Sequence, residues 1–197
     1  MRPALIIFIK NPRPGQVKTR LAATVGTDKA LAIYRALLKR VRQVTQRVQV
    51  TKYLYYSQHI DEGDEWSPVQ FHKRLQSGAD LGARMSNAMA EILSFHDSVV
   101  LIGSDVPGIT STILDRAFQA LVDHDLVIGS TEDGGYYLIG MSRLQTSLFD
   151  GMVWSTETVF EETIRRAKYR GLSWHELPML ADIDFEEDWK KLGWELD

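Results

Sequence analysis

The sequence contains no cysteine among its 197 residues. That absence excludes a disulfide framework, a thiolate nucleophile and a cysteine-ligated zinc site. Long apolar runs are also missing, since a run such as residues 4–9 is far shorter than the roughly 20 residues that span a bilayer. Arg2 and Pro3 lead straight into this run and Lys10 closes it, which is not the order of a signal peptide. We therefore expect a cytoplasmic protein with no membrane partner.

Acidic side chains are scarce in the first 50 residues, which contain eleven Lys and Arg but a single acid, Asp28. The other 147 residues carry 12 basic and 25 acidic side chains, and the net charge is −3. An acidic total argues against general nucleic-acid binding, which needs a basic domain. A local basic site for a small anion fits better, with carboxylates elsewhere in the chain available to hold a cation.

Short apolar runs of strand length alternate with segments of helical periodicity. Residues 4–9 and 99–102 are continuously apolar, as strands of a parallel sheet are when both faces are buried. The pattern predicts strands at 4–9, 50–56, 69–75, 99–102, 126–128, 136–139 and 172–177, and helices at 27–48, 80–93, 110–122, 156–168 and 184–192. This order indicates an α/β protein with a mostly parallel sheet in a single domain, residues 1–197.

The loop after the first predicted strand, residues 10–20, contains four cations and no acid. Ligands of open α/β sheets bind beyond the carboxyl ends of the strands, where this loop is expected to lie. Gly15 is free to take a positive φ, and Lys18 and Arg20 are suited to the oxygens of a di- or triphosphate. The alternative is a solvated basic turn, because neither the Walker nor the Rossmann glycine pattern is present.

A carboxylate follows the buried run at 99–102, in the Gly-Ser-Asp-Val-Pro-Gly segment of residues 103–108. Asp105 can offer an oxygen to Mg²⁺ or Mn²⁺, because these hard cations prefer carboxylates and substrate phosphates. The alternative is that Asp105 caps a turn or the following helix, which is a common duty of aspartate.

Two glycines follow an aspartate in residues 132–137, between two predicted strands. Gly134 and Gly135 would permit close approach of a ligand, and Asp133 would lie at that approach. The alternative is a simple hairpin turn.

Acidic residues also crowd the segment 181–188 near the end of the sequence. Asp182 and Asp184 share one side if the chain is extended there, so both could face a metal. In the alternative interpretation Asp184 and Glu187 form a capping box at the start of the last helix.

Five segments in this order, residues 10–21, 76–85, 103–108, 132–140 and 154–159, resemble the bacterial DUF2064 family. That family is also described as radical-SAM/selenodomain-associated transferases, and it belongs to the nucleotide-diphospho-sugar transferase superfamily. The resemblance covers almost the whole chain. It implies a GT-A-like, Rossmann-type three-layer sandwich with a mostly parallel central sheet.

The same resemblance assigns roles to residues of these segments. It implies that a nucleotide is bound by Lys10, Pro14, Gly15, Lys18, Arg20, Asp80 and Arg84. It implies substrate binding by Gly134, Gly135, Trp154 and Glu157. Asp105 and Asp133 take the catalytic roles, and Asp105 and Asp184 are the implied ligands of Mg²⁺ or Mn²⁺.

The function that these assignments imply is that of a metal-dependent, glycosyltransferase-like enzyme. Its substrates would be a nucleotide-diphosphate sugar and a small-molecule acceptor. One alternative is a nucleotidyltransferase, similar to the guanylyltransferase that activates phospholactate, acting on a phosphorylated small molecule. Another is a nucleotide-binding protein without turnover.

Overall fold

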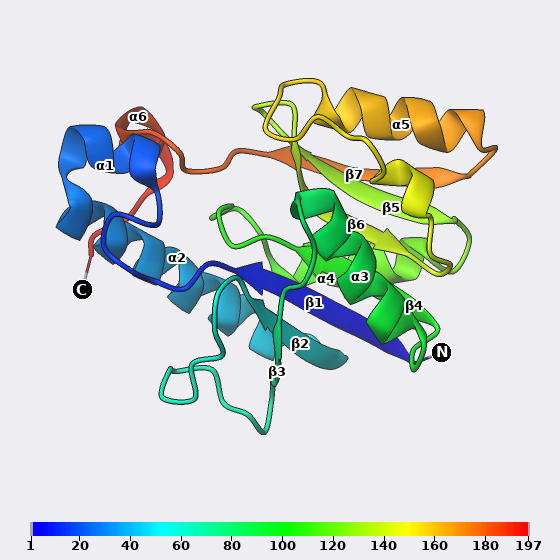
Figure 1. Ribbon diagram of the computed structural model, residues 1–197, viewed down its shortest axis with the longest axis horizontal. Helices are drawn as coiled ribbons and strands as arrows, with labels where there is room; N and C mark the ends of the chain where they lie inside the picture. The colour runs from blue at the N-terminus through cyan, green and yellow to red at the C-terminus, as the bar shows by residue number, and fades with distance from the viewer. Residues whose placement is uncertain (1, 197) are drawn as a thin grey trace.

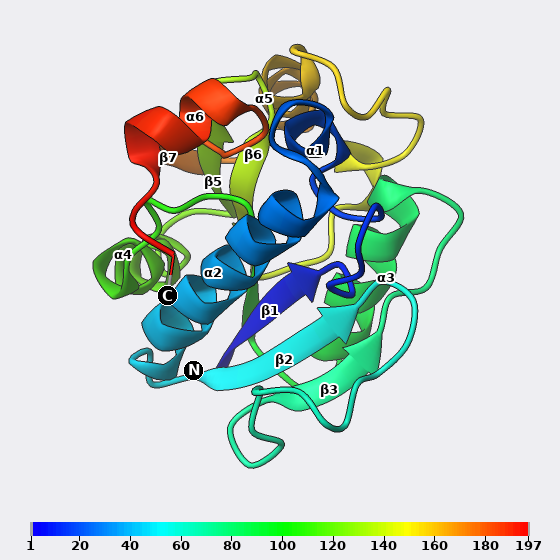
Figure 2. The same ribbon diagram turned by 90° about the vertical axis from the view of Figure 1, so that its left-hand side faces the viewer.

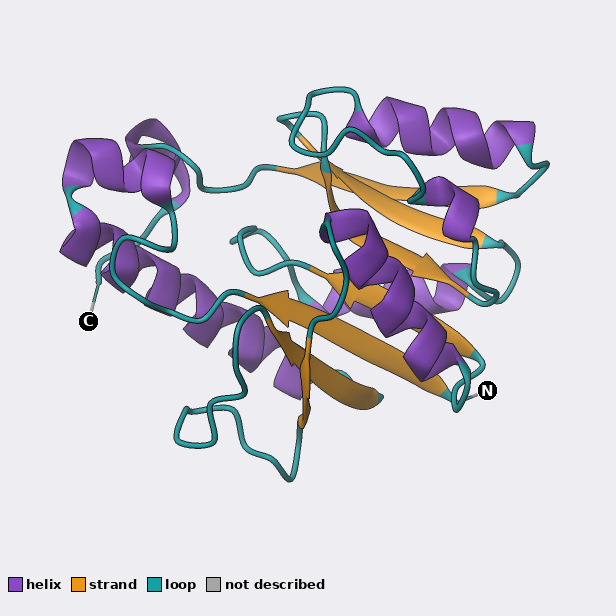
Figure 3. Ribbon diagram, viewed as in Figure 1, coloured by secondary structure: helices purple, strands orange, loops and turns teal. Residues whose placement is uncertain are grey.

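The computed structural model describes residues 2–196, and its seven strands form one sheet in the order β3-β2-β1-β4-β6-β5-β7. Figure 3 shows the strands at the centre of the molecule with helices on both sides. The strands are β1 (Pro3–Ile9), β2 (Thr51–Tyr56), β3 (His72–Leu75), β4 (Ser98–Ile102), β5 (Leu126–Thr131), β6 (Tyr136–Met141) and β7 (Trp174–Leu180).

One strand of this sheet runs against the others. β6 is antiparallel to both β4 and β5, whereas the remaining pairs of neighbours are parallel. The reversal follows from the tight turn at residues 132–135, which joins β5 directly to β6. As a result the carboxyl ends of β1, β4, β5 and β7 share one edge of the sheet with the amino end of β6.

Helices cover both faces of the sheet, as Figure 1 shows. On β1, Leu5, Ile7 and Ile9 pack toward α2 (Thr27–Gln46) and α4 (Ser111–Ala120). The alternate side chains of the strand pack toward α3 (Leu81–Leu93) and α5 (Val159–Tyr169). Because both faces of β1 are buried, its sequence is continuously apolar rather than alternating. The three-layer α/β prediction is therefore confirmed.

The sequence pattern missed one helix and misplaced the ends of others. α1 (Thr19–Val25) was not predicted, and its first two residues fall in the predicted basic loop. α5 begins three residues later than predicted. β7 runs from Trp174 to Leu180 instead of over 172–177, and α6 (Glu186–Leu192) starts two residues later than expected. A short 3₁₀ helix at Thr146–Leu148 was also not predicted.

A small separate core holds α1 and α6 against α2. Figure 2 shows α1 and α6 side by side at one end of α2. The buried side chains of this core are Leu21, Ala30, Ile33, Leu37 and Ile183. Through it, the two chain segments that flank the carboxyl edge of the sheet are fixed to the same helix.

No helix within residues 2–196 is both long enough and apolar enough to cross a membrane.

Gly140, near the end of β6, has no room for a side chain. A Cβ there would lie 2.8 Å from methyl groups of both Val100 and Val127 and 3.0 Å from the Val99 carbonyl oxygen. We predict that Gly140→Ala lowers the free energy of unfolding by about 1–3 kcal/mol, the usual cost of overpacking a core. Gly63→Ala is the control, since its Cβ would meet only ordinary contact with Asp61. Equal urea midpoints for the two variants would contradict the packing of β6 between its neighbours.

Candidate active site

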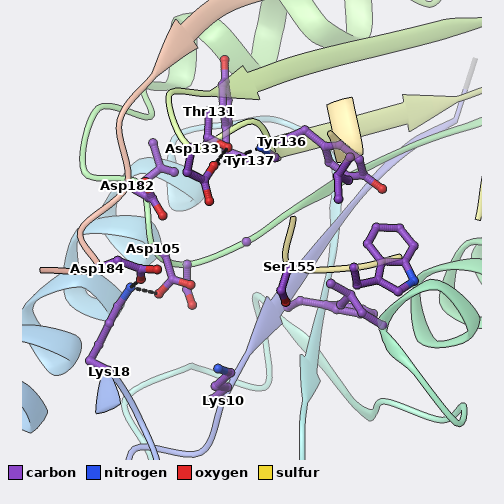
Figure 4. Close-up of a pocket in the computed structure, with 18 of the residues that line it drawn as sticks. Lys10, Lys18, Asp105, Thr131, Asp133, Tyr136, Tyr137, Ser155, Asp182 and Asp184 are labelled. Carbon is purple, nitrogen blue, oxygen red and sulfur yellow. Dashed lines mark hydrogen bonds and ion pairs between the residues drawn. The ribbon is translucent and has the colours of Figure 1, made fainter. Parts of the chain in front are cut away.

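A cavity of about 650 Å³ opens at the carboxyl edge of the sheet. Its walls come from the loops after β1 and β4, the turn between β5 and β6, the segment 154–157 and the segment after β7. These segments are distant in sequence, but the topology of the sheet brings them to the same edge. Figure 4 shows side chains from all of them directed into one space.

Lys18 carries a buried ammonium group into the lining of this cavity. Its side chain is only 4% exposed. Its Nζ donates to Oδ1 of Asp105 at 2.8 Å and to Oδ1 of Asp184 at 3.1 Å. Burial by itself lowers the pKa of Lys18, but the two carboxylates outweigh it and the net shift is upward. The backbone of Lys18 is left-handed, with φ 49°, and turns the loop into α1.

Asp184 links Lys18 to Arg20. Its Oδ2 accepts from Nη1 of Arg20 at 3.1 Å, and the Arg20 guanidinium lies over the ring of Phe185. The capping-box interpretation of Asp184 is wrong. At the start of α6 it is Asp188 Oδ2 that accepts from the backbone N–H groups of Asp184 and Phe185, at 3.0 and 2.7 Å. The Asp184 carboxylate therefore caps no helix, and it lines the cavity in ion pairs with Lys18 and Arg20.

Asp105 is held in place through its backbone and its neighbours. The Asp105 carbonyl oxygen accepts from the N–H of Ile183 at 3.1 Å, which ties the segment after β7 to the loop after β4. The buried hydroxyl of Tyr34 lies 3.2 Å from Ser104 Oγ and accepts from the backbone N–H of Lys10 at 2.8 Å. Burial, and then the charge of Asp105, raises the pKa of Tyr34, so this hydroxyl stays neutral.

Asp133 and Asp182 form a second acidic group in the cavity. Asp133 Oδ1 accepts from Thr131 Oγ1 at 2.5 Å and from the backbone N–H of Gly135 at 3.0 Å, as in the hairpin interpretation, and Asp133 also lines the cavity. Burial, followed by the charges of Asp133 and Asp184, raises the pKa of Asp182 to about 6. The negative charges of Asp133 and Asp184 thus disfavour the ionised form of Asp182.

An aromatic pair lies in the opposite wall of the cavity. The rings of Tyr136 and Trp154 meet edge to face with centroids 6.3 Å apart, and the Tyr136 hydroxyl points toward Met85 Sδ at 3.9 Å. Ser155 follows Trp154 with a positive φ of 63°, which is rare for a residue other than glycine. Trp154 and Glu157, both predicted to bind substrate, line the cavity.

The two glycines of the β5–β6 turn lie differently from one another. Gly135 lines the cavity, as predicted. Gly134 does not line it in the described structure. Its φ is +85°, and a Cβ there would lie 1.9 Å from the carbonyl oxygen of Glu157. The close approach that Gly134 permits is therefore made by the protein's own backbone.

The predicted nucleotide-binding residues divide into two groups. Three basic side chains line the cavity: Lys10, Lys18 and Arg20. The other four lie outside its lining in the described part of the chain: Pro14, Gly15, Asp80 and Arg84.

The residues outside the lining have local structural roles. Gly15 takes the expected positive φ, at 71°, in the turn of the loop. Asp80 is the N-cap of α3 and accepts from the backbone N–H of Ala83 at 2.8 Å. Arg84 donates through Nε to the Gly78 carbonyl oxygen at 3.3 Å. Their nucleotide-binding roles stay predictions.

Tyr34 and Gln76 shape the site but were not among the predicted site residues. Gln76 Nε2 donates to the carbonyl oxygens of Ile9 and Tyr55, at 3.1 and 3.0 Å, and so joins the ends of β1 and β2. Gln76 belongs to one of the five family segments, which was a usable signal. Tyr34 has the ordinary helical spacing of a core residue, and nothing in the pattern separates it from its neighbours.

The chemistry of the lining fits a divalent cation. Five lining side chains are acids and three are basic, which leaves two negative charges when all are ionised. Asp105 and Asp184 already share one cation, the ammonium group of Lys18. In residues 2–196 no three His, Cys, Asp or Glu side chains lie close enough to hold a metal together. Asp105 and Asp184 could offer two carboxylates to Mg²⁺ or Mn²⁺, and their role as metal ligands stays a prediction.

Comparison with known proteins places the chain in a family. The model of DUF2064, described as an uncharacterized protein conserved in bacteria, matches residues 40–156. The chain belongs to the DUF2064 family. A proposed nucleotide-diphospho-sugar transferase from Desulfovibrio desulfuricans G20 is 33% identical, and the match covers 94% of this chain and 84% of that one, with a TM-score of 0.86. This DUF2064 protein has no match among curated proteins.

More distant structures share the fold alone. The 4-diphosphocytidyl-2C-methyl-D-erythritol synthase of Anaerococcus prevotii DSM 20548 has a TM-score of 0.64 at 10% identity, with coverage of 98% of this chain and 94% of that one. Rv0371c of Mycobacterium tuberculosis H37Rv, in complex with manganese, has a TM-score of 0.56 at 14% identity, and 98% of each chain is covered.

The raised pKa of Asp182 predicts a pH-dependent effect on stability. Its pKa of about 6 lies above the 3.8 of an unperturbed aspartate, so the folded protein binds this proton more tightly than the unfolded chain. The stabilisation from that proton is complete below pH 3.8 and is lost as the pH rises to 6. We predict that Asp182→Asn, without added metal, raises the melting temperature over the parent at pH 7.5 more than at pH 4.5. The exposed Asp123→Asn is the control, and a gain for Asp182→Asn independent of pH would contradict the prediction.

Proposed function

We propose that this protein is a transferase whose nucleotide substrate binds in the cavity at the carboxyl edge of the sheet. The observation that carries the proposal is the convergence, in one pocket, of cations from the loop after β1 and carboxylates from the loops after β4 and β7. Cations suit the phosphates of a nucleotide, and the carboxylates suit a metal that binds those same phosphates. The family relative from Desulfovibrio desulfuricans G20 carries a description of the same kind.

The finer proposal is a metal-dependent, glycosyltransferase-like reaction of a nucleotide-diphosphate sugar. Lys18 and Arg20 would bind the diphosphate, and their charge would stabilise the negative charge that grows on it as the sugar leaves. Asp105 and Asp184 would hold Mg²⁺ or Mn²⁺, which supplies further neutralisation of the leaving diphosphate. The manganese complex of a protein with the same fold supports this choice of metal.

The acceptor would bind on the other side of the cavity, near Asp133 and Asp182. A carboxylate with a pKa near 6 is largely ionised at neutral pH yet basic enough to take a proton from an acceptor hydroxyl. Trp154 and Glu157 line the opposite wall of the same cavity, and an aromatic ring with a nearby carboxylate suits a polyhydroxylated acceptor. Asp133 would orient the acceptor through the oxygen that does not hold the hairpin turn.

Nucleotidyl transfer is the second candidate. The loop after β4 carries one aspartate, Asp105, and not the Asp-x-Asp pair of many glycosyltransferases. Two neighbours in fold are a 4-diphosphocytidyl-2C-methyl-D-erythritol synthase and an inositol-1-phosphate CTP transferase. In such a reaction of this protein, a phosphorylated acceptor would attack a nucleoside triphosphate and release pyrophosphate. The same cavity would serve, with Lys18 and Arg20 on the triphosphate.

Product analysis tests both candidates. Purified protein is screened by thermal shift with nucleoside di- and triphosphates and nucleotide sugars, with and without Mn²⁺, because a ligand of the native state raises its melting temperature. The nucleotides that bind are then incubated with panels of sugar, alcohol and phosphorylated acceptors. Release of nucleoside diphosphate indicates glycosyl transfer, and release of pyrophosphate indicates nucleotidyl transfer. Binding without either product would leave a nucleotide-binding protein without turnover.

We predict that Arg20→Ala weakens nucleotide binding much more than Arg2→Ala. Arg20 lines the cavity, whereas Arg2 lies before β1 at the opposite edge of the sheet, beside Asp97. Loss of one charge-assisted hydrogen bond to phosphate should cost about 1.5–3 kcal/mol, or roughly 10- to 150-fold in Kd. Isothermal titration calorimetry measures the difference. Equal nucleotide affinities of the two variants would contradict the proposal that the loop of residues 10–20 binds the phosphates.

We predict that nucleotide raises the melting temperature more with Mn²⁺ than without it, and that Asp105→Asn abolishes this difference. The amide keeps the size of the carboxylate but not the charge that a hard cation requires. Asp123→Asn again serves as the control. A metal response that survives in Asp105→Asn would move the metal to the group of Asp133 and Asp182.

A further inference from the structure

Lys18 holds the position between Asp105 and Asp184 that a divalent cation would need. We infer that Lys18 and the metal exclude each other there. Lys18 leaves the two carboxylates when the metal binds, and its ammonium group then pairs with the phosphates of the nucleotide. The part of this exchange that concerns the phosphates rests on the proposed function, but the competition with metal does not.

The ammonium group of Lys18 fills the space between the carboxylates of Asp105 and Asp184. One ammonium nitrogen lies 2.8 Å from an oxygen of Asp105 and 3.1 Å from an oxygen of Asp184. Mg²⁺ binds carboxylate oxygens at about 2.0–2.1 Å, closer than either contact. A metal between the same two carboxylates would therefore occupy the volume of the ammonium group. The repulsion between two buried cations at such a distance also excludes joint occupancy.

The lining of the cavity has an excess of negative charge. Lys18 neutralises only part of it, because five acidic and three basic side chains line the cavity and Asp133 and Asp182 lie near the pair of Asp105 and Asp184. Arg20 contacts Oδ2 of Asp184, and its side chain is 58% exposed. A divalent cation in place of the ammonium group of Lys18 would neutralise more of this negative charge, because it carries two positive charges instead of one. Without a new partner, however, the displaced Lys18 would lose two ion pairs.

The cavity offers Lys18 a second place. Its side chain is flexible, it starts from the loop that also carries Arg20, and it lines the open cavity as well as the carboxylate pair. Phosphate oxygens bound there would replace the two carboxylates as partners. Metal and nucleotide should therefore bind cooperatively, because each removes a cost from the binding of the other.

The decisive measurement is Mn²⁺ affinity without nucleotide, read from the electron paramagnetic resonance signal of free Mn²⁺. If Lys18 occupies the site in 90–99% of molecules, Lys18→Met should lower the Kd for Mn²⁺ by about 10- to 100-fold. Lys10→Met is the matched control, because Lys10 lines the same cavity and Figure 4 shows its ammonium group away from the carboxylate pair. Lys18→Arg keeps a cation in place and should bind Mn²⁺ about as weakly as the parent.

A different result overturns the inference. If Lys18 instead organises the carboxylates for metal, Lys18→Met weakens Mn²⁺ binding. If Lys10→Met raised the affinity for Mn²⁺ as much as Lys18→Met does, the loss of any positive charge in the cavity would explain the result, and the inference would fail. Failure of both the parent and Lys18→Met to bind Mn²⁺ also overturns it.

A measurement on the unaltered protein covers the possibility that Lys18→Met does not fold. The amine of Lys18, which is buried and held in two ion pairs, should react slowly with trace acetic anhydride, as quantified by mass spectrometry of the peptide that contains it. Mg²⁺ should increase this labelling, and a nucleotide added with Mg²⁺ should reduce it again. Labelling that metal leaves unchanged or lowers, while Mn²⁺ binds, would contradict the exchange.

The outcomes separate this inference from the proposed function. If Lys18→Met weakens Mn²⁺ binding while the parent protein forms product, only the exchange fails. If metal releases Lys18 but no nucleotide protects it and no product forms, the transferase proposal fails and the competition stands.

Discussion

The contact of one buried ammonium group with two carboxylates organises the whole carboxyl edge of the sheet. Lys18 precedes α1, Asp105 follows β4 and Asp184 follows β7, so this contact joins three segments that are far apart in sequence. A buried charge without a partner is very unfavourable, and each of these segments therefore depends on the other two for its position. The backbone hydrogen bond from Ile183 to Asp105 reinforces the same junction.

The reversal of β6 determines what can lie opposite this junction. Because β6 returns antiparallel between β4 and β5, the β5–β6 turn stands at the same edge as the loops of the parallel strands. Gly134 then lets the backbone near Glu157 approach closely, and Phe160 donates its N–H to the Gly134 carbonyl oxygen at 2.9 Å. The start of α5 is thereby fixed beside the turn. The aromatic pair of Tyr136 and Trp154 is thereby placed in the cavity that also holds the ion pairs of Lys18.

The sequence pattern predicted the layers of the fold but not the segments that depend on tertiary contacts. The run at 4–9 identified β1 because burial on both faces leaves a clear compositional signal. α1 left no such signal. It has seven residues, its N-cap is Lys18 without a capping side chain, and Leu21 is its one buried residue. A helix this short forms because α2 and α6 pack against it.

The site could be predicted only as far as side-chain chemistry shows in sequence. The basic loop and Asp105 stood out by composition and position, and both lie at the cavity. Asp184 was ambiguous because the spacing of Asp184 and Glu187 imitates a capping box, whereas Asp188 performs that role through contacts that spacing does not reveal. Asp80 and Arg84 lie in a family segment, yet their side chains serve the backbone around α3. Local hydrogen bonding competes for the residue types that also bind ligands.

Backbone strain gives an independent reason to regard this cavity as functional. Within residues 2–196 only two residues other than glycine have positive φ, Lys18 and Ser155, and both line the cavity. Such conformations are unfavourable by about 1–3 kcal/mol each and persist only where the surroundings compensate. For Lys18 the compensation is its pair of ion pairs, which ligands of the site would disturb. The ion pairs that hold the left-handed backbone of Lys18 lie in the cavity itself. A ligand that breaks these ion pairs would also remove what stabilises this backbone conformation, and we therefore expect the loop to change conformation when the cavity is filled.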